Sequence, residues 1–97
     1  MFNKLKQFKD LRNQAKQMQN MLAQESAESD AAWGKVKVKI NGNQEILDIQ
    51  IDPELLTTDN KEKLQNALKD ATNEAIKKIQ RIMAEKMRAS GFKMPEL

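Results

Sequence analysis

The sequence contains no cysteine and no histidine among its 97 residues. These absences exclude disulfides, thiol nucleophiles, imidazole bases and the usual zinc ligand sets. Carboxylates remain as metal ligands, but none has the spacing of a calcium-binding loop. We interpret Asp52, Glu54, Asp59 and Glu62 as strand-exit and helix-capping groups. We therefore expect no metal, no cofactor, no small-molecule substrate and no enzymatic activity.

Glycine, proline and long apolar runs are also scarce. There are three glycines and two prolines, and no apolar run approaches the roughly 20 residues of a membrane span. The N-terminus lacks the apolar stretch of roughly 7–15 residues found in signal peptides. These features predict a cytoplasmic chain with no membrane partner, and the length predicts one domain over residues 1–97. A domain this short has a thin core, which a partner subunit would help to stabilise.

Positive charge is concentrated at the two ends of the chain. The net charge is +3, from 17 basic and 14 acidic residues. Residues 1–24 and residues 61–97 each carry +4, whereas residues 25–34 carry −3 and residues 35–60 carry −2. A mildly basic chain permits nucleic-acid binding, and this distribution directs attention to the terminal segments.

Residues 2–24 have the apolar periodicity of one helix face. Apolar residues recur at intervals of three and four from Phe8 to Leu22. We predict a helix whose apolar stripe packs on another helix or on a sheet. Residues 25–34 are small and acidic with little periodicity, which favours a loop. Trp33 in this stretch is interpreted as a packing residue, with base stacking as the alternative.

Basic and apolar residues alternate over residues 35–41, which predicts a half-buried strand. Its apolar face comprises Val36, Val38 and Ile40. Asn41-Gly42 predicts a type I′ hairpin turn, in which both central residues have φ > 0. The return strand is expected from about Gln44 to Asp52. Its predicted apolar face comprises Leu47, Ile49 and Ile51.

The polar face of the first predicted strand carries three lysines, Lys35, Lys37 and Lys39. They could contact phosphates. The alternative, which we favour, is a solvated face that protects a sheet edge and is neutralised by acidic residues on a neighbouring strand.

Apolar residues keep helical spacing from about residue 60 onward, and Ser90-Gly91 is expected to close this helix. About 30 residues span roughly 45 Å, whereas a compact domain of about 100 residues has a radius of gyration near 13 Å. We therefore predict that the helix projects into solvent or is partly covered by a second subunit. The residues expected in the core or dimer interface are Val36, Val38, Ile40, Leu47, Ile49, Ile51, Leu68, Ile79 and Met83.

Two basic clusters are the candidate DNA contacts. They comprise Lys4, Lys6, Lys9, Arg12 and Lys16 in the first predicted helix, and Lys77, Lys78, Arg81, Lys86 and Arg88 in the last. Each cluster alone could be an ordinary solvated helix face. Their joint enrichment at both ends of the chain favours a surface that contacts phosphates without distinguishing base sequence.

Several motifs occur in a characteristic order. They are Lys16-Gln17-Met18-Gln19, Gly34 to Gly42, Ile49 to Leu56 with Asp52-Pro53, Glu85-Lys86-Met87, and Gly91-Phe92-Lys93-Met94-Pro95. Together they resemble the YbaB/EbfC family of small bacterial nucleoid-associated proteins over nearly the whole chain. The block of two strands joined by Asn-Gly and ending in Asp-Pro-x-Leu-Leu is the most specific part.

The resemblance implies a two-layer α+β fold of a helix, three antiparallel strands and a helix. The extra strand would lie within residues 25–33, where periodicity alone favours a loop. The resemblance also implies homodimers with a shared central sheet and projecting helices, DNA binding, and association with the nucleoid. It assigns no base-reading residue.

The first hypothesis is therefore a homodimeric nucleoid-associated protein that binds duplex DNA mainly through backbone phosphates. Nucleoid organisation, gene regulation and DNA repair are its candidate roles. Replacing Lys77, Lys78 and Arg81 by glutamate should weaken binding to all sequences similarly. The alternative is a protein-interaction adaptor associated with recombination or replication proteins. Its docking surface would include Met18, Met21, Met83 and Met87, although these methionines would equally suit a dimer core.

Overall fold

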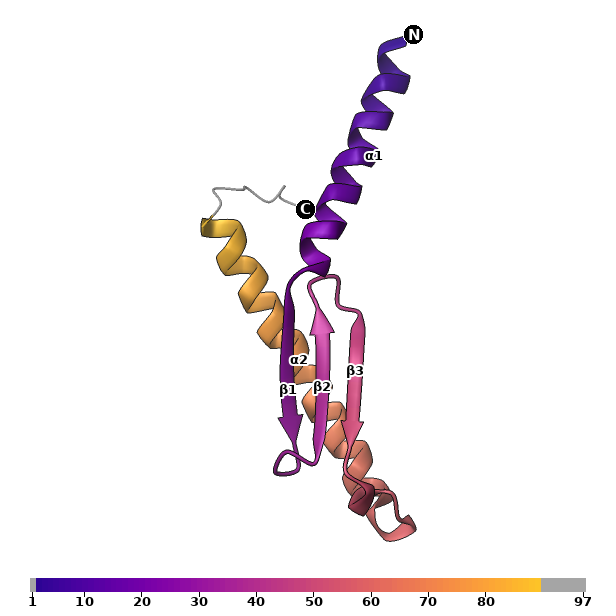
Figure 1. Ribbon diagram of the computed structural model, residues 1–97, viewed down its shortest axis with the longest axis vertical. Coiled ribbons are helices and arrows are strands. Elements are labelled where there is room, and N and C mark those ends of the chain that lie inside the picture. The colour runs from indigo at the N-terminus through magenta and orange to yellow at the C-terminus, as the bar shows by residue number, and fades with distance from the viewer. Residues whose placement is uncertain (1, 90–97) are drawn as a thin grey trace.

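The computed structural model describes residues 2–89, with side-chain surroundings from residue 4 onward (Figure 1). The elements in chain order are α1 (Phe2–Ala23), β1 (Ser26–Ala31), β2 (Val36–Asn41), β3 (Ile46–Ile51), the short 3₁₀ helices η1 (Pro53–Leu55) and η2 (Thr58–Asn60), and α2 (Lys61–Ala89). This order confirms the α+β fold of a helix, three antiparallel strands and a helix. The predicted helix end at Ser90-Gly91 lies outside the described residues.

The three strands form one antiparallel sheet in the order β1-β2-β3. Val36 and Val38 of β2 pair with Ile51 and Ile49 of β3. On the other side of β2, the same face continues through small residues of β1, because Ala27 pairs with Ile40. Paired residues of an antiparallel sheet share a face, so these side chains form the apolar side of the sheet.

The loop that periodicity favours for residues 25–34 is wrong, and the strand that the resemblance implies within residues 25–33 is confirmed, because Ser26–Ala31 form β1. Every second residue of this strand faces the core, and those residues are small. Ala27 and Ser29 are buried. Alanine and serine give a much weaker alternation of hydrophobicity than valine and isoleucine, so periodicity did not reveal the strand.

The hairpin predicted at Asn41-Gly42 exists, but its turn is not the two-residue type I′ turn. Four residues separate β2 from β3, and among residues 41–45 only Gln44 has a positive φ, of 62°. The Asn41 side-chain oxygen accepts hydrogen bonds from the backbone N–H groups of Asn43 (3.0 Å) and Glu45 (3.0 Å). Asparagine therefore shapes this turn through its side chain, by a local hydrogen-bonding pattern typical of asparagine in turns.

Helix α2 crosses behind the sheet and packs mainly on β1 and β2 (Figure 1). The buried residues of α2 recur at four-residue intervals as Ala67, Ala71, Ala75 and Ile79. The three alanines allow the helix to approach the sheet closely. Within the described residues, the core consists of this stripe, the apolar face of β2, Ala27 of β1 and Leu55 of η1.

The residues predicted for the core or dimer interface differ in burial. Val36, Val38, Ile40 and Ile79 are buried, and Ile51, Leu68 and Met83 are half-buried against them. Leu47 and Ile49 are 51% and 45% exposed, so they do not belong to the core of a single chain. The physical reason is that α2 packs mainly on β1 and β2. A register shift after Lys39 also pairs Ile40 with Ile46, which removes Leu47 from the predicted apolar face.

The molecule is elongated, with extents of 65 × 27 × 22 Å and a radius of gyration of 18.5 Å. A compact chain of about 100 residues would have a radius of gyration near 13 Å. No helix within residues 2–89 is both long and apolar enough to cross a membrane.

Candidate nucleic-acid interface

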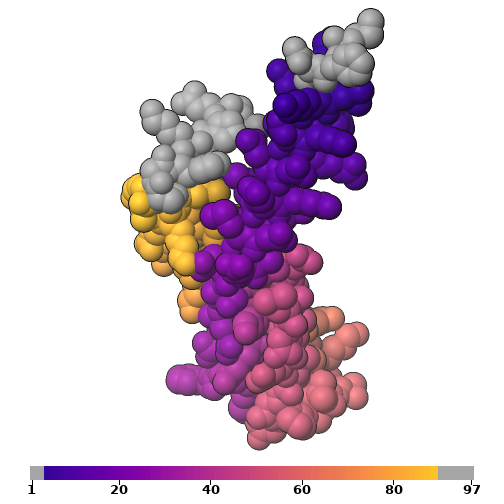
Figure 2. Space-filling view, turned by 45° about the horizontal axis from the view of Figure 1, so that its top comes forward, coloured from indigo at the N-terminus to yellow at the C-terminus, as the bar shows by residue number. Residues whose placement is uncertain are grey.

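Helix α1 projects from the sheet over most of its length (Figures 1 and 2). Its 22 residues span about 33 Å at 1.5 Å per residue. Leu5, Phe8 and Leu11 on its apolar stripe are 73%, 70% and 64% exposed. The predicted packing of this stripe on a helix or sheet is therefore wrong for its projecting part in the single chain, whereas Met18 and Leu22 near the end of α1 lie beside α2.

The last turn of α1 is joined to the loop between β2 and β3. The backbone N–H of Gly42 donates to the carbonyl oxygens of Leu22 (2.9 Å) and Glu25 (3.0 Å). The Asn43 side-chain amide donates to the carbonyl oxygen of Gln19 at 3.1 Å. A Cβ atom at position 42 would lie 2.3 Å from the Leu22 carbonyl oxygen. Glycine is therefore required for this junction, which positions the whole projecting helix.

The predicted basic cluster of α1 is solvent-exposed. All five side chains are exposed, and none forms an ion pair within the part of the chain that is described. They are Lys4, Lys6, Lys9, Arg12 and Lys16. Asp10 is the single acidic residue of α1. The positive charge of this helix is therefore available to an external anion.

In the predicted basic cluster of α2, some side chains already have partners within the chain. Lys77 pairs with Glu74 at 3.6 Å, and Lys86 pairs with Glu25. The Lys78 ammonium donates to the carbonyl oxygen of Glu28 at 3.1 Å, on the outer edge of β1. Arg81 and Arg88 are exposed, with no ion pair inside residues 4–89. Among the predicted α2 residues, these two arginines are the least engaged within the chain.

The two basic segments come from opposite ends of the sequence but lie at the same end of the molecule (Figure 1). The ion pair between Lys86 of α2 and Glu25, just after α1, connects them directly. The opposite end of the sheet is net acidic. It carries Asp30, Asp52, Glu54, Asp59 and Glu62 against Lys35, Lys37, Lys61 and Lys63. The fold thus brings the two basic ends of the sequence together and gives the molecule one basic end.

A groove of about 860 Å³ lies between the C-terminal parts of α1 and α2. Its apolar lining comprises Met18, Met21, Leu22, Met83 and Met87. The four methionines of the adaptor hypothesis are therefore brought together at one place. The adaptor hypothesis itself stays a hypothesis.

Lys37 and Lys39 lie on the central strand β2 and Lys35 lies just before it, so these lysines cannot protect a sheet edge as predicted. Lys39 lies between Glu28 and Asp48 of the neighbouring strands, and Lys37 lies opposite Asp30. This arrangement favours mutual neutralisation across strands over phosphate contact.

Lys35, just before β2, forms an ion pair with Glu54. The hydrogen bond from the Lys35 ammonium to Glu54 raises the pKa of Lys35 above its ordinary value of 10.5. The negative charges of Glu54 and Asp52 act in the same direction.

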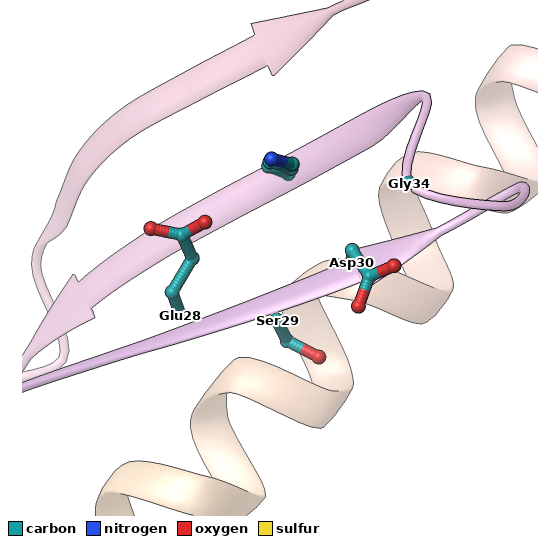
Figure 3. Close-up of a pocket in the computed structure, with 5 residues that line it drawn as sticks. Glu28, Ser29, Asp30 and Gly34 are labelled. Atoms are coloured by element: carbon teal, nitrogen blue, oxygen red, sulfur yellow. The ribbon is translucent and has the colours of Figure 1, made fainter.

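The same polar face contains a shallow depression of about 410 Å³ (Figure 3). Its lining consists of Glu28, Ser29, Asp30, Gly34 and Lys37. Glu28 and Asp30 contribute two carboxylates against one lysine, so the depression does not suit a phosphate. The Ser29 side chain points to the opposite side, toward α2 (Figure 3).

Trp33 is 99% exposed, so its interpretation as a packing residue is wrong for the described chain. It lies in the turn between β1 and β2, where Ala32, Trp33 and Gly34 have φ values of 53°, 61° and 81°. Left-handed backbone at a bulky residue is uncommon. The exposed position of Trp33 could not be predicted from the sequence, because Gly34 alone does not indicate a turn with three left-handed residues.

Comparisons with known proteins agree over most of the chain. The family model of the YbaB/EbfC DNA-binding family matches residues 1–94. A nucleoid-associated protein from Syntrophobacter fumaroxidans is 34% identical over 98 residues, covering 99% of this chain and 89% of that protein. Another from Pelotomaculum thermopropionicum is 38% identical over 95 residues, covering 96% of this chain and 90% of that protein.

The crystal structure of an uncharacterized protein from Helicobacter pylori has a similar fold. It superposes with a TM-score of 0.63 at 27% identity, covering 80% of this chain and 90% of that chain. The family model and the relatives give the assignment: the chain belongs to the YbaB/EbfC DNA-binding family, which is a family of nucleoid-associated DNA-binding proteins and not a family of enzymes.

Proposed function

We propose that this protein associates with the nucleoid as a homodimer and binds duplex DNA through backbone phosphates with little sequence specificity. The observation that carries the proposal is the convergence of the two basic helical segments, α1 and the second half of α2, at one end of the molecule (Figure 1). Nucleoid organisation, gene regulation and DNA repair are the candidate roles. Sequence-independent binding suits the first of these best.

Lysine and arginine side chains on exposed helices contact phosphates through flexible stems. Such contacts determine where a protein sits on the duplex but carry no base information. The five basic residues of α1 have no competing ion pair within the described residues. Binding would therefore depend on charge at α1, with Arg81 and Arg88 extending the same surface.

The exposed, apolar edge of β3 supports the homodimer. This strand is at the edge of the sheet, so one side of its backbone has no strand partner within residues 2–89. Ile46, Leu47 and Ile49 on it are 49%, 51% and 45% exposed. An exposed apolar edge strand favours pairing with another strand. The outer edge of β1 is less available for pairing, because the Lys78 ammonium already donates a hydrogen bond to the Glu28 carbonyl oxygen.

Pairing of β3 with β3 of a second copy would use the same surface on both subunits, as a two-fold dimer requires. The two sheets would become one, and the dimer would display two α1 helices and two α2 ends. A duplex would then meet four basic segments, which explains how a chain with a net charge of only +3 could bind a polyanion.

The test compares two double charge reversals that change the net charge equally. Lys9→Glu with Arg12→Glu alters exposed residues of α1, and Lys61→Glu with Lys63→Glu alters exposed residues at the acidic end. We expect the first variant to bind several unrelated duplexes at least about tenfold more weakly, with a smaller dependence on salt. The control variant should bind nearly as the wild type does. Equal losses in the two variants would mean that net charge, and not the α1 surface, governs binding.

A further inference from the structure

The turn between β1 and β2 presents the only tryptophan of the sequence to solvent. Trp33 is the most exposed large apolar side chain in the part of the chain that the structure describes. Tryptophan is highly buried on average. The turn is closed by a hydrogen bond from the Lys35 N–H to the Ala32 carbonyl at 3.2 Å. A short closed turn holds the indole away from the core, in a position to contact another molecule.

The groove between α1 and α2 has an apolar lining that is complementary to the exposed indole of Trp33. Its apolar lining consists mainly of methionine and leucine side chains, next to glutamines of α1 and the Glu25–Lys86 ion pair, and Met21 and Met18 on its α1 side are 67% and 36% exposed. Methionine is flexible, fills irregular space and makes favourable sulfur–aromatic contacts. Such a groove accepts an indole ring well.

Trp33 cannot reach the groove of its own chain. The groove is lined by residues near the end of α1, whereas Trp33 comes after β1, a strand that leads away from α1 (Figure 1). The six residues of β1 span about 20 Å at 3.3 Å per residue. Any contact between the two features therefore joins two molecules.

The charges around the two features are also complementary. Lys86 lines the groove but pairs with Glu25, which also lines it, so the remaining positive charge comes from Lys16 and Arg88, which are exposed on the same two helix segments. The region around Trp33 carries Asp30, Asp52 and Glu54 against two lysines: Lys35 pairs with Glu54, and Lys37 lies opposite Asp30 on the neighbouring strand. Opposite charges favour encounter of the acidic end of one molecule with the basic end of another.

We propose that Trp33 of one molecule inserts into the groove between α1 and α2 of a second copy, so that molecules associate head to tail. The groove residues belong to α1, α2 and the segment between α1 and β1, and none to β3. The contact is thus compatible with a homodimer that pairs through β3, and it requires no DNA binding. Because two different surfaces meet, the contact is heterologous and generates open chains unless its rotation closes a ring.

The experiment is sedimentation of the full chain over a series of protein concentrations without DNA, together with tryptophan emission. We expect the average mass to rise beyond the dimer as concentration increases. The emission of Trp33 should shift to shorter wavelength in parallel, because the indole becomes buried. Trp33→Ala should weaken this association by about 30-fold or more, which corresponds to about 2 kcal/mol.

Two further variants separate the contact from a general loss of apolar surface. Met21→Glu places a charge in the groove and should abolish both the growth in mass and the shift in emission. Leu56→Ala removes another exposed apolar side chain, 63% exposed, and should change neither.

Growth in mass that Trp33→Ala leaves intact would overturn the proposal, and so would a mass that stops at the dimer. An emission shift that appears only when DNA is added would assign Trp33 to nucleic-acid contact and would equally overturn it. Trp33-dependent growth that starts from a monomer would support the head-to-tail contact while contradicting the homodimer proposed above.

Discussion

Gly42 joins α1 to the sheet through two backbone hydrogen bonds, and the absence of a side chain at this position makes both of them attainable. Its N–H donates to Leu22 and Glu25. A methyl group here would lie 2.3 Å from the Leu22 carbonyl oxygen and 3.0 Å from the Met83 sulfur. A single glycine thus determines how the projecting helix leaves the body of the molecule.

Gly42→Ala should destabilise the protein by about 1–3 kcal/mol, because backbone atoms of α1 must move to accommodate the new methyl group. Urea unfolding measures the change. Asn43→Ala is the matched control in the same loop, since it removes only the hydrogen bond to Gln19 and should cost at most about 0.5 kcal/mol. Equal stabilities of the two variants would contradict the role assigned to Gly42.

The ion pair between Lys35 and Glu54 predicts a pH dependence of stability in the alkaline range. Folding raises the pKa of Lys35, so its contribution is fully present below the ordinary pKa of 10.5. The contribution is lost as pH rises through the higher pKa of the folded state. The melting temperatures of wild type and Lys35→Met should therefore converge above pH 10.5. A constant difference up to higher pH would show that packing of the lysine stem, not charge, is responsible.

At the scale of elements, the two edge strands, β1 and β3, differ in how accessible their outer edges are. Lys78 donates to a carbonyl on the outer edge of β1. The edge of β3 carries exposed isoleucine and leucine side chains, and α2 packs mainly on the other two strands. The sheet therefore favours extension at β3 over extension at β1.

Ile49→Lys should convert the proposed homodimer to a monomer without unfolding it, because Ile49 is already 45% exposed. Light scattering gives the mass, and circular dichroism checks the fold. Leu56→Lys changes an equally apolar exposed residue outside the sheet and should leave the dimer intact. A dimeric Ile49→Lys protein would exclude β3 as the shared edge.

The sequence allowed prediction of the elements whose side chains alternate strongly. The valines and isoleucine of β2 revealed that strand, and apolar spacing revealed both helices. β1 was not predictable from periodicity because Ala27 and Ser29 are small enough to lie beneath the alanines of α2. The Asn41 turn was misassigned because its hydrogen bonds come from a side chain, and Gly42 serves a contact distant in sequence.

At the scale of the whole molecule, the fold converts a sequence with basic ends into a body with one basic end. α1 and the second half of α2 lie together, although about 50 residues separate them along the sequence. The candidate lysines and arginines could be named from the sequence, but the sequence did not reveal which of them have ion-pair or hydrogen-bond partners within the chain. Lys77, Lys78 and Lys86 have partners, whereas Arg81, Arg88 and the α1 residues have none within the described chain.

The central claim, phosphate-driven DNA binding, is tested most directly by fluorescence anisotropy of a random-sequence duplex at two salt concentrations. A protein that makes several phosphate contacts loses about 10³–10⁵ in affinity between about 50 mM and about 200 mM salt. We expect a loss of at least about a thousandfold, the same for unrelated sequences. A loss below about tenfold, or binding to one sequence alone, would contradict the account.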